Sequence, residues 1–116
     1  MAIPSGSGSE VLKRGTFTVT DNTDTKILDG AADHIYTVLS VVVVETAGAA
    51  ETFDLYVDPS AGGTDYEILS DQALGANETF VWNDRMVLTA TDELNIKAGG
   101  ACNIDIYISY IDQDWS

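Results

Sequence analysis

The stretch that decides the fold is His34–Glu45, whose sequence is HIYTVLSVVVVE. Its β-branched and aromatic residues favour an extended strand, in which successive side chains point to opposite faces. Alternation places Ile35, Leu39, Val41 and Val43 on one face, and Tyr36, Val38, Val42 and Val44 on the other. Both faces are therefore apolar. We expect either a central strand whose second face is covered by a loop or the N-terminal arm, or a strand buried against another copy of the chain.

Sequence on both sides of this stretch also alternates between apolar and polar residues. The alternation is clearest in Thr52–Asp58, Glu93–Ala98 and Cys102–Ile111, and turn clusters rich in Gly, Asn and Asp recur about every ten residues. Further strands are expected at Val11–Thr20, Tyr66–Leu74, Glu78–Trp82 and Met86–Ala90. The pattern predicts an all-β protein, an antiparallel β-sandwich of about eight strands. Strand count does not fix the connectivity, which stays open at this point.

The first ten residues differ in composition from the rest of the chain. Met1–Glu10 contains the Gly/Ser run Ser5–Ser9, and such runs behave as flexible coil. We therefore expect a flexible N-terminal arm over 1–10 and a single domain over 11–116. The arm is either a disordered start or a segment that becomes ordered against a partner subunit. It has neither the basic start nor the apolar stretch of a signal peptide.

The charge balance excludes several classes of partner. The 116 residues include 5 Lys and Arg against 19 Asp and Glu, which gives a formal net charge of −14. Nucleic acid and anionic membrane surfaces are thus not expected partners, because both need clustered cations. Cys102 is the single cysteine, so no intrachain disulfide can form, which fits assembly in a reducing cytoplasm. The longest aliphatic run, Val41–Val44, is far too short to span a membrane.

No set of residues predicts catalysis or a metal site. His34 is the single histidine, and no nucleophile motif accompanies it, so we expect a structural role and no enzyme activity. Cys102 is expected to be a small buried apolar residue. Asp21–Asp24 lacks the spacing of a calcium loop and predicts a turn. We predict no cofactor and no metal, although a calcium ion shared between subunits is a minor alternative at Asp29/Asp33 and Asp112/Asp114.

Aromatic residues offer one binding alternative. Tyr56 and Tyr107 are expected on the polar faces of their strands, and Trp82 and Trp115 lie in the second half of the chain. Such residues form cross-strand packing or a subunit interface more often than a stacking platform for sugars. A carbohydrate-binding module is therefore kept as an alternative of another class.

From about Ile27 to Ile111 the chain resembles the small all-β virion proteins of tailed bacteriophages that decorate or cement the capsid. The resemblance is carried by the runs IYTVLSVVV at Ile35–Val43, TFDLYV at Thr52–Val57 and VLTATDELNIKA at Val87–Ala98. It is a pattern of apolar strands joined by small-residue and Asp turns, and it is shared by tail and fibre components. No individual functional residue carries over from the family.

The resemblance implies a jelly-roll-like sandwich that forms homo-oligomers, with trimers favoured, and binds the major capsid protein. The implied function is a non-enzymatic decoration protein that stabilises contacts between capsid subunits on the surface of the virion, assembled in the host cytoplasm. A tail or fibre-associated virion protein is the alternative. The candidate subunit-interface residues are Ile3, Tyr36, Val38, Val42, Val44, Trp82 and Trp115.

Overall fold

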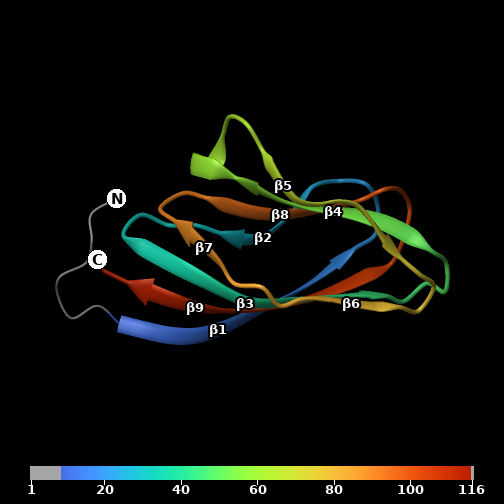
Figure 1. Ribbon diagram of the computed structural model, residues 1–116, viewed down its shortest axis with the longest axis horizontal. Coiled ribbons are helices and arrows are strands. Elements are labelled where there is room, and N and C mark those ends of the chain that lie inside the picture. The colour runs from blue at the N-terminus through green and yellow to red at the C-terminus, as the bar shows by residue number, and fades with distance from the viewer. Residues whose placement is uncertain (1–8, 116) are drawn as a thin grey trace.

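Two antiparallel β-sheets pack face to face in the computed structural model, which describes residues 9–115 (Figure 1). Together they confirm the predicted all-β sandwich. The five-stranded sheet comprises β1 (Ser9–Val19), β9 (Ile104–Asp114), β3 (His34–Glu45), β6 (Thr79–Trp82) and β7 (Met86–Thr89). The four-stranded sheet comprises β2 (Thr25–Asp29), β8 (Glu93–Ala98), β4 (Glu51–Asp58) and β5 (Tyr66–Leu74), and a short 3-10 turn, η1 (Pro59–Ala61), follows β4.

The strands pair in a nested order, in which strands from the start of the chain pair with strands from its end. β1 pairs with β9, β2 with β8, β3 with both β6 and β7, and β4 with β5. The pairs β3–β9 and β4–β8 then join these into the two sheets. This connectivity, which the sequence left open, is jelly-roll-like.

Alternating apolar residues of the two sheets form the core between the layers. Ile104, Ile106 and Ile108 of β9 face Phe53 and Leu55 of β4 across the sandwich, and all five are at most 2% exposed. Burial of each such side chain contributes about 2 kcal/mol. The predicted alternation is confirmed in β9. In β4 and β8 the expected core residues Phe53, Leu55, Leu94, Ile96 and Ala98 are buried, but Tyr56 and Asn95 of the expected polar faces are buried as well.

A β-bulge in β3 changes which side chains of this strand face the core. The pairing of β3 with β9 shifts between Val38 and Ser40, so one residue is inserted near Leu39. Side chains before and after the bulge consequently face the core in different phases: Tyr36 and Val38 before it, Val41 and Val43 after it. The prediction that Tyr36 and Val38 share a face with Val42 and Val44 is wrong for this reason.

One strand was not predicted, and several strand boundaries differ from expectation. β2 was not predicted, because a bulge between Lys26 and Leu28 lets the adjacent Ile27 and Leu28 both be buried and breaks the alternation. β1 begins at Ser9, two residues earlier than expected, and Ser9 pairs with Asp114. The rest of the predicted arm lies outside the described residues.

Candidate subunit-contact surface

The solvent side of the five-stranded sheet carries two mainly apolar rows, each of which crosses four of its five strands. We call this surface the outer face. The cross-strand register aligns one row as Leu12, Ile111, Thr37 and Val87. The register aligns the second row as Thr16, Tyr107, Val42 and Val81.

These rows hold most of the exposed large apolar side chains of the described residues. Leu12 is 74% exposed, Val87 59%, Val81 50% and Tyr107 43%. Several large apolar side chains exposed on one face of a sheet are typical of a surface that binds another molecule. The outer face is therefore the leading candidate for a contact with another molecule.

Charge is sparse on the outer face. Between the two rows the register aligns Arg14 with Ser109 and Ser40. Among the described residues the other charged side chains that the strand register places on this side are Glu10 and Asp105, near its two ends. For a chain with a net charge of −14, this surface is close to neutral.

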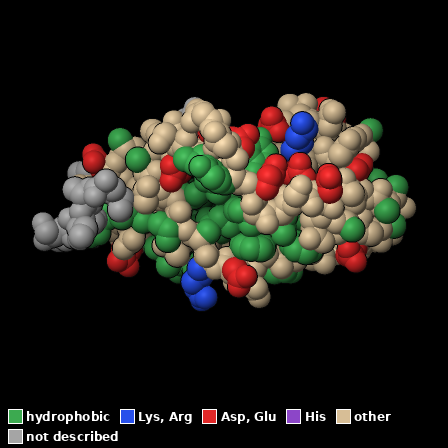
Figure 2. Space-filling view, turned by 45° about the horizontal axis from the view of Figure 1, so that its top comes forward, with side chains coloured by type: hydrophobic (Ala, Val, Ile, Leu, Met, Phe, Trp, Pro, Cys, Tyr) green, Lys and Arg blue, Asp and Glu red, His purple; other side chains and the backbone are tan. Residues whose placement is uncertain are grey.

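The outer side of the four-stranded sheet has the opposite character; we call it the acidic face. Cross-strand pairing aligns Asp54 with Lys97, Asp58 with Glu93, and Tyr56 with Glu67. Figure 2, in which this layer is turned partly toward the viewer, shows acidic side chains spread over the surface and few basic ones. The sandwich thus presents one nearly neutral side and one strongly negative side.

Like charges are held together on the acidic face. Burial and the nearby carboxylates Asp54, Asp65 and Asp71 raise the pKa of Glu67. Burial, together with Asp65 and Glu93, likewise raises the pKa of Asp58. This concentration of negative charge opposes folding and would be relieved by a cationic partner or by protonation.

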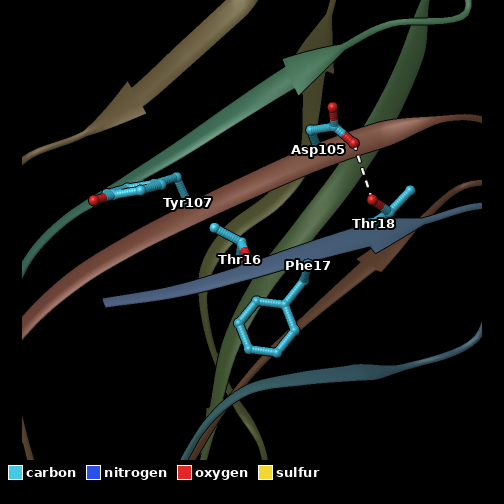
Figure 3. Close-up of a pocket in the computed structure, with 5 residues that line it drawn as sticks. All are labelled: Thr16, Phe17, Thr18, Asp105 and Tyr107. Atoms are coloured by element: carbon cyan, nitrogen blue, oxygen red, sulfur yellow. Dashed lines mark hydrogen bonds between the residues drawn. The ribbon is translucent and has the colours of Figure 1, made fainter. Parts of the chain in front are cut away.

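A shallow depression of about 400 Å³ lies at the β1–β9 end of the outer face. Figure 3 shows Thr16, Thr18, Asp105 and Tyr107 along it, with the side chain of Tyr107 projecting away from the β9 ribbon and Phe17 on the other side of β1. The Thr18 hydroxyl donates to the Asp105 carboxylate at 3.0 Å. The depression offers room for an inserted apolar side chain beside Tyr107.

A polar cluster joins three strands at one end of the sandwich. The Asp112 carboxylate of β9 accepts from Lys13 Nζ of β1 and from His34 Nδ1 of β3, each at 2.7 Å. Burial raises the pKa of this carboxyl, but the hydrogen bonds from Lys13 and His34 outweigh it and hold the pKa below its usual range. His34 also stacks on Tyr36. The expected structural role of His34 fits this arrangement, and both oxygens of the Asp112 carboxylate have hydrogen-bond partners within its own chain.

Glu45 has a role that the sequence did not indicate. It is 1% exposed, and its carboxylate accepts hydrogen bonds from the backbone N–H groups of Ala47, Gly48, Ala49 and Asn77. These bonds, that of Asn77 foremost, lower the pKa of Glu45. One carboxylate therefore fixes the β3–β4 loop and ties it to the loop before β6.

Apart from the two tryptophans, the predicted interface residues separate into three groups. Val42 and Val44 lie on the outer face, as required for a contact, and their role there stays a prediction. Tyr36 and Val38 are 7% and 0% exposed and belong to the core, so they cannot contribute to a contact on the outer face. Ile3 lies outside the described residues.

The two tryptophans turn toward their own domain. Trp82 pairs with the fully buried Val41 and packs against the core, so it does not project from the surface. Trp115 donates its backbone N–H to the Asp33 carbonyl at 2.8 Å, which ties the end of the chain to the turn before β3. Both indole Nε1 atoms are buried, without a hydrogen-bond partner among the described residues.

Other residues considered for binding or catalysis are buried or hydrogen-bonded within their own chain. Tyr56 faces outward but is only 8% exposed, and burial with a hydrogen bond to Asp24 raises its pKa. The Cys102 thiol donates to the Val19 carbonyl at 3.4 Å, and burial raises its pKa. Asp21 accepts from the Thr23 N–H, which is the predicted turn.

Residues 9–115 contain no cluster of three or more His, Cys, Asp or Glu arranged to hold a metal ion. No helix in that range is long and apolar enough to cross a membrane.

No protein-family model matches the sequence, and no curated protein matches it either. Solved structures share the fold over nearly the whole chain. A subunit of the disulfide-linked pili of Bacillus endospore appendages is 14% identical to this chain, with a TM-score of 0.57. The match covers 100% of this chain and 97% of that one. A protein in the acid-stable capsid of Helicobacter pylori bacteriophage KHP30 is 11% identical, with a TM-score of 0.54 and 95% of each chain covered.

A third structure has the same fold in another setting. The Drosophila NLP core, described for its pentamer formation and histone binding, is 14% identical, with a TM-score of 0.55, covering 91% of this chain and 100% of that one. At these identities the likeness shows the fold alone. The biological role has to be argued from the surfaces.

Proposed function

We propose that this chain is a non-enzymatic structural protein of a virion, and specifically a decoration protein of a bacteriophage capsid. It binds the outer shell, stabilises contacts between major capsid subunits, and forms homo-oligomers. The observation that carries the proposal is the outer face, a broad and nearly neutral surface on a chain with a net charge of −14.

The two faces of the sandwich have different roles in this proposal. The outer face provides a subunit contact, since its apolar rows gain free energy when covered. The acidic face complements basic patches on a shell and repels nucleic acid. Many identical copies that each bury a modest interface raise the free energy needed to open the shell, because attachment at several points is multivalent.

The fold supports this proposal in a limited way. The likeness to a protein in the KHP30 capsid shows that a sandwich of this size and connectivity can serve in a phage shell. The described residues contain no cluster of three or more His, Cys, Asp or Glu that could hold a metal ion, and their single histidine is hydrogen-bonded to Asp112. The surfaces are what remain for function.

A tail or fibre protein of the same virion is the second candidate. It is favoured by the likeness, over the whole chain, to a subunit of the Bacillus endospore pili, since a sandwich of this fold can also be arranged in a fibre. A carbohydrate-binding module has less support, because Trp82 packs inward and cannot join Tyr107 in a stacking platform.

Gold-labelled antibodies against the chain, applied to virions grown from the genome that encodes it, test the proposal by electron microscopy. Label over the heads is the expected result. Label confined to tails or fibres would support the second candidate instead. Unlabelled particles, together with free protein in the lysate, would overturn both.

A further inference from the structure

We propose that the outer face binds the same face of a second copy, about a two-fold axis that runs along the strands between β9 and β3. The inference rests on the proposed function only in taking the outer face to be a subunit contact. It goes further by naming the partner and the register of the contact.

The strand order makes the outer face self-complementary. A two-fold axis along the strands exchanges the two halves of the sheet, so β1 of one copy covers β6 and β7 of the other, and β9 covers β3. Leu12 then lies over the partner's Val87, and Tyr107 lies over the partner's Val42. Both apolar rows are thus matched with apolar rows across the interface.

The two most exposed aliphatic side chains of the described residues meet in this arrangement. Leu12 and Val87 are the most exposed of the large aliphatic side chains in the described residues, at 74% and 59%. They lie at opposite edges of the sheet, where one copy alone cannot bring them together. In the second row Val81 of the partner lies over Thr16, beside the depression at Tyr107.

The charges on the outer face are compatible with this pairing. Asp105 lies over the partner's Val44 and Glu10 over the partner's Thr89, so neither acid faces a like charge. Arg14 lies over the partner's connection between β6 and β7, which contains both Asp84 and Arg85. Two acidic faces could not meet in the same way, because their carboxylates would repel.

The area is also adequate. Four strand widths and five rows of outward side chains correspond to roughly 600 Å² of projected sheet. The accessible area is larger, because side chains stand above the sheet, and it approaches the ~800 Å² per partner of a standard interface. Aligned packing of two sheets about 10 Å apart is a common way to bury such faces.

Two single variants and their mixture test the register by sedimentation velocity and native mass spectrometry. Leu12→Lys and Val87→Asp should each raise the dimer dissociation constant at least about 100-fold, because each places a charge in an apolar contact. An equimolar mixture of L12K and V87D should recover a dimer that contains one copy of each. There the new lysine faces the new aspartate, while the other pair keeps its native residues.

The control variant is Tyr66→Lys, which alters a side chain that is 63% exposed and lies on β5, in the other sheet. It should leave dimerisation unchanged. Circular dichroism and the melting temperature establish that all three variants are folded, so loss of the dimer is not loss of the fold.

Each outcome decides the matter. A wild-type dimer that is lost in both variants and restored in the mixture supports the two-fold pairing. A wild-type trimer, which the resemblance to decoration proteins implied, or a strict monomer would overturn it and leave the gold-labelling result untouched. A wild-type dimer that the mixture does not restore would overturn this register.

Discussion

At the residue scale, Asp112 is a buried carboxylate that links three strands through side-chain hydrogen bonds. Its two hydrogen bonds, to Lys13 and His34, connect β1, β3 and β9 at the end where the chain's described termini meet. Because it is 4% exposed, its charge has few other partners. Removing the charge therefore leaves two cationic or polar groups without their acceptor.

We predict that Asp112→Asn destabilises the protein by about 2 kcal/mol at neutral pH, a value below that of a fully buried pair because Lys13 is half exposed. The pKa of Asp112 is lower in the folded state, so its contribution is present above the ordinary carboxyl pKa and is lost as pH falls through the folded value. Urea unfolding of both proteins across the acid range measures this. The curves should converge at low pH.

The control for this measurement is Asp84→Asn, which changes an exposed carboxylate in the β6–β7 connection. It should alter the free energy of unfolding by less than about 0.5 kcal/mol. If D112N behaves like D84N at neutral pH, the polar cluster does not stabilise the fold as argued.

The hydrogen-bonding roles of Glu45 and Asp112 could not be predicted from the sequence. Both carboxylates are counted in the charge of the chain, and nothing in their local sequence distinguishes them from exposed acids. Their roles depend on partners far along the chain, since Asn77 is 32 residues from Glu45 and Lys13 is 99 from Asp112. Alternation alone cannot reveal such partners.

At the element scale, the strands could be predicted because period-2 alternation follows directly from burial of one face. Their register could not. The bulge near Leu39 depends on hydrogen bonding between β3 and β9, about 70 residues apart, and it moves Tyr36 and Val38 from the expected surface into the core. The outer face, which needs four strands in register, was therefore visible only as the apolar second side of His34–Glu45.

The contact between β2 and the β7–β8 turn gives a prediction at this scale. Gly30 follows β2, and its N–H donates to the Asp92 carbonyl at 2.8 Å. A Cβ at this position would overlap the backbone oxygens of Ala90 and Asp92, which cannot move without opening the turn. Gly30→Ala should therefore destabilise the protein by about 3 kcal/mol, measured by urea unfolding.

Gly62→Ala is the matched control, because nothing lies within 4 Å of its Cβ position and its φ of 172° is ordinary extended backbone. It should be close to neutral. Equal effects of the two substitutions would mean that the tight packing of Gly30 does not constrain the fold.

At the scale of the whole molecule, the uneven distribution of charge should govern the response to pH and salt. Glu67 and Asp58 have raised pKa values in the folded state, so the native protein binds more protons than the unfolded chain as the pH falls toward those values. Protonation of these two groups therefore increases the free energy of unfolding on mild acidification. At lower pH, protonation of Asp112 and Glu45 decreases it.

We predict that the urea midpoint rises between neutral pH and about pH 5, and that added salt raises it at neutral pH by screening the acidic face. Glu67→Gln should raise the midpoint at neutral pH and flatten the pH dependence, whereas D84N should change neither. A midpoint that falls steadily on acidification would contradict the argument from like charges.

The central claim is that the nearly neutral outer face is a contact between subunits. Native mass spectrometry of the wild-type chain and of Val42→Glu, with Tyr66→Glu as the control on the other sheet, tests it most directly. We predict that the wild type and Y66E form the same assembly and that V42E is a folded monomer. A wild type that is a strict monomer, or a V42E variant that assembles as the wild type does, would contradict the claim.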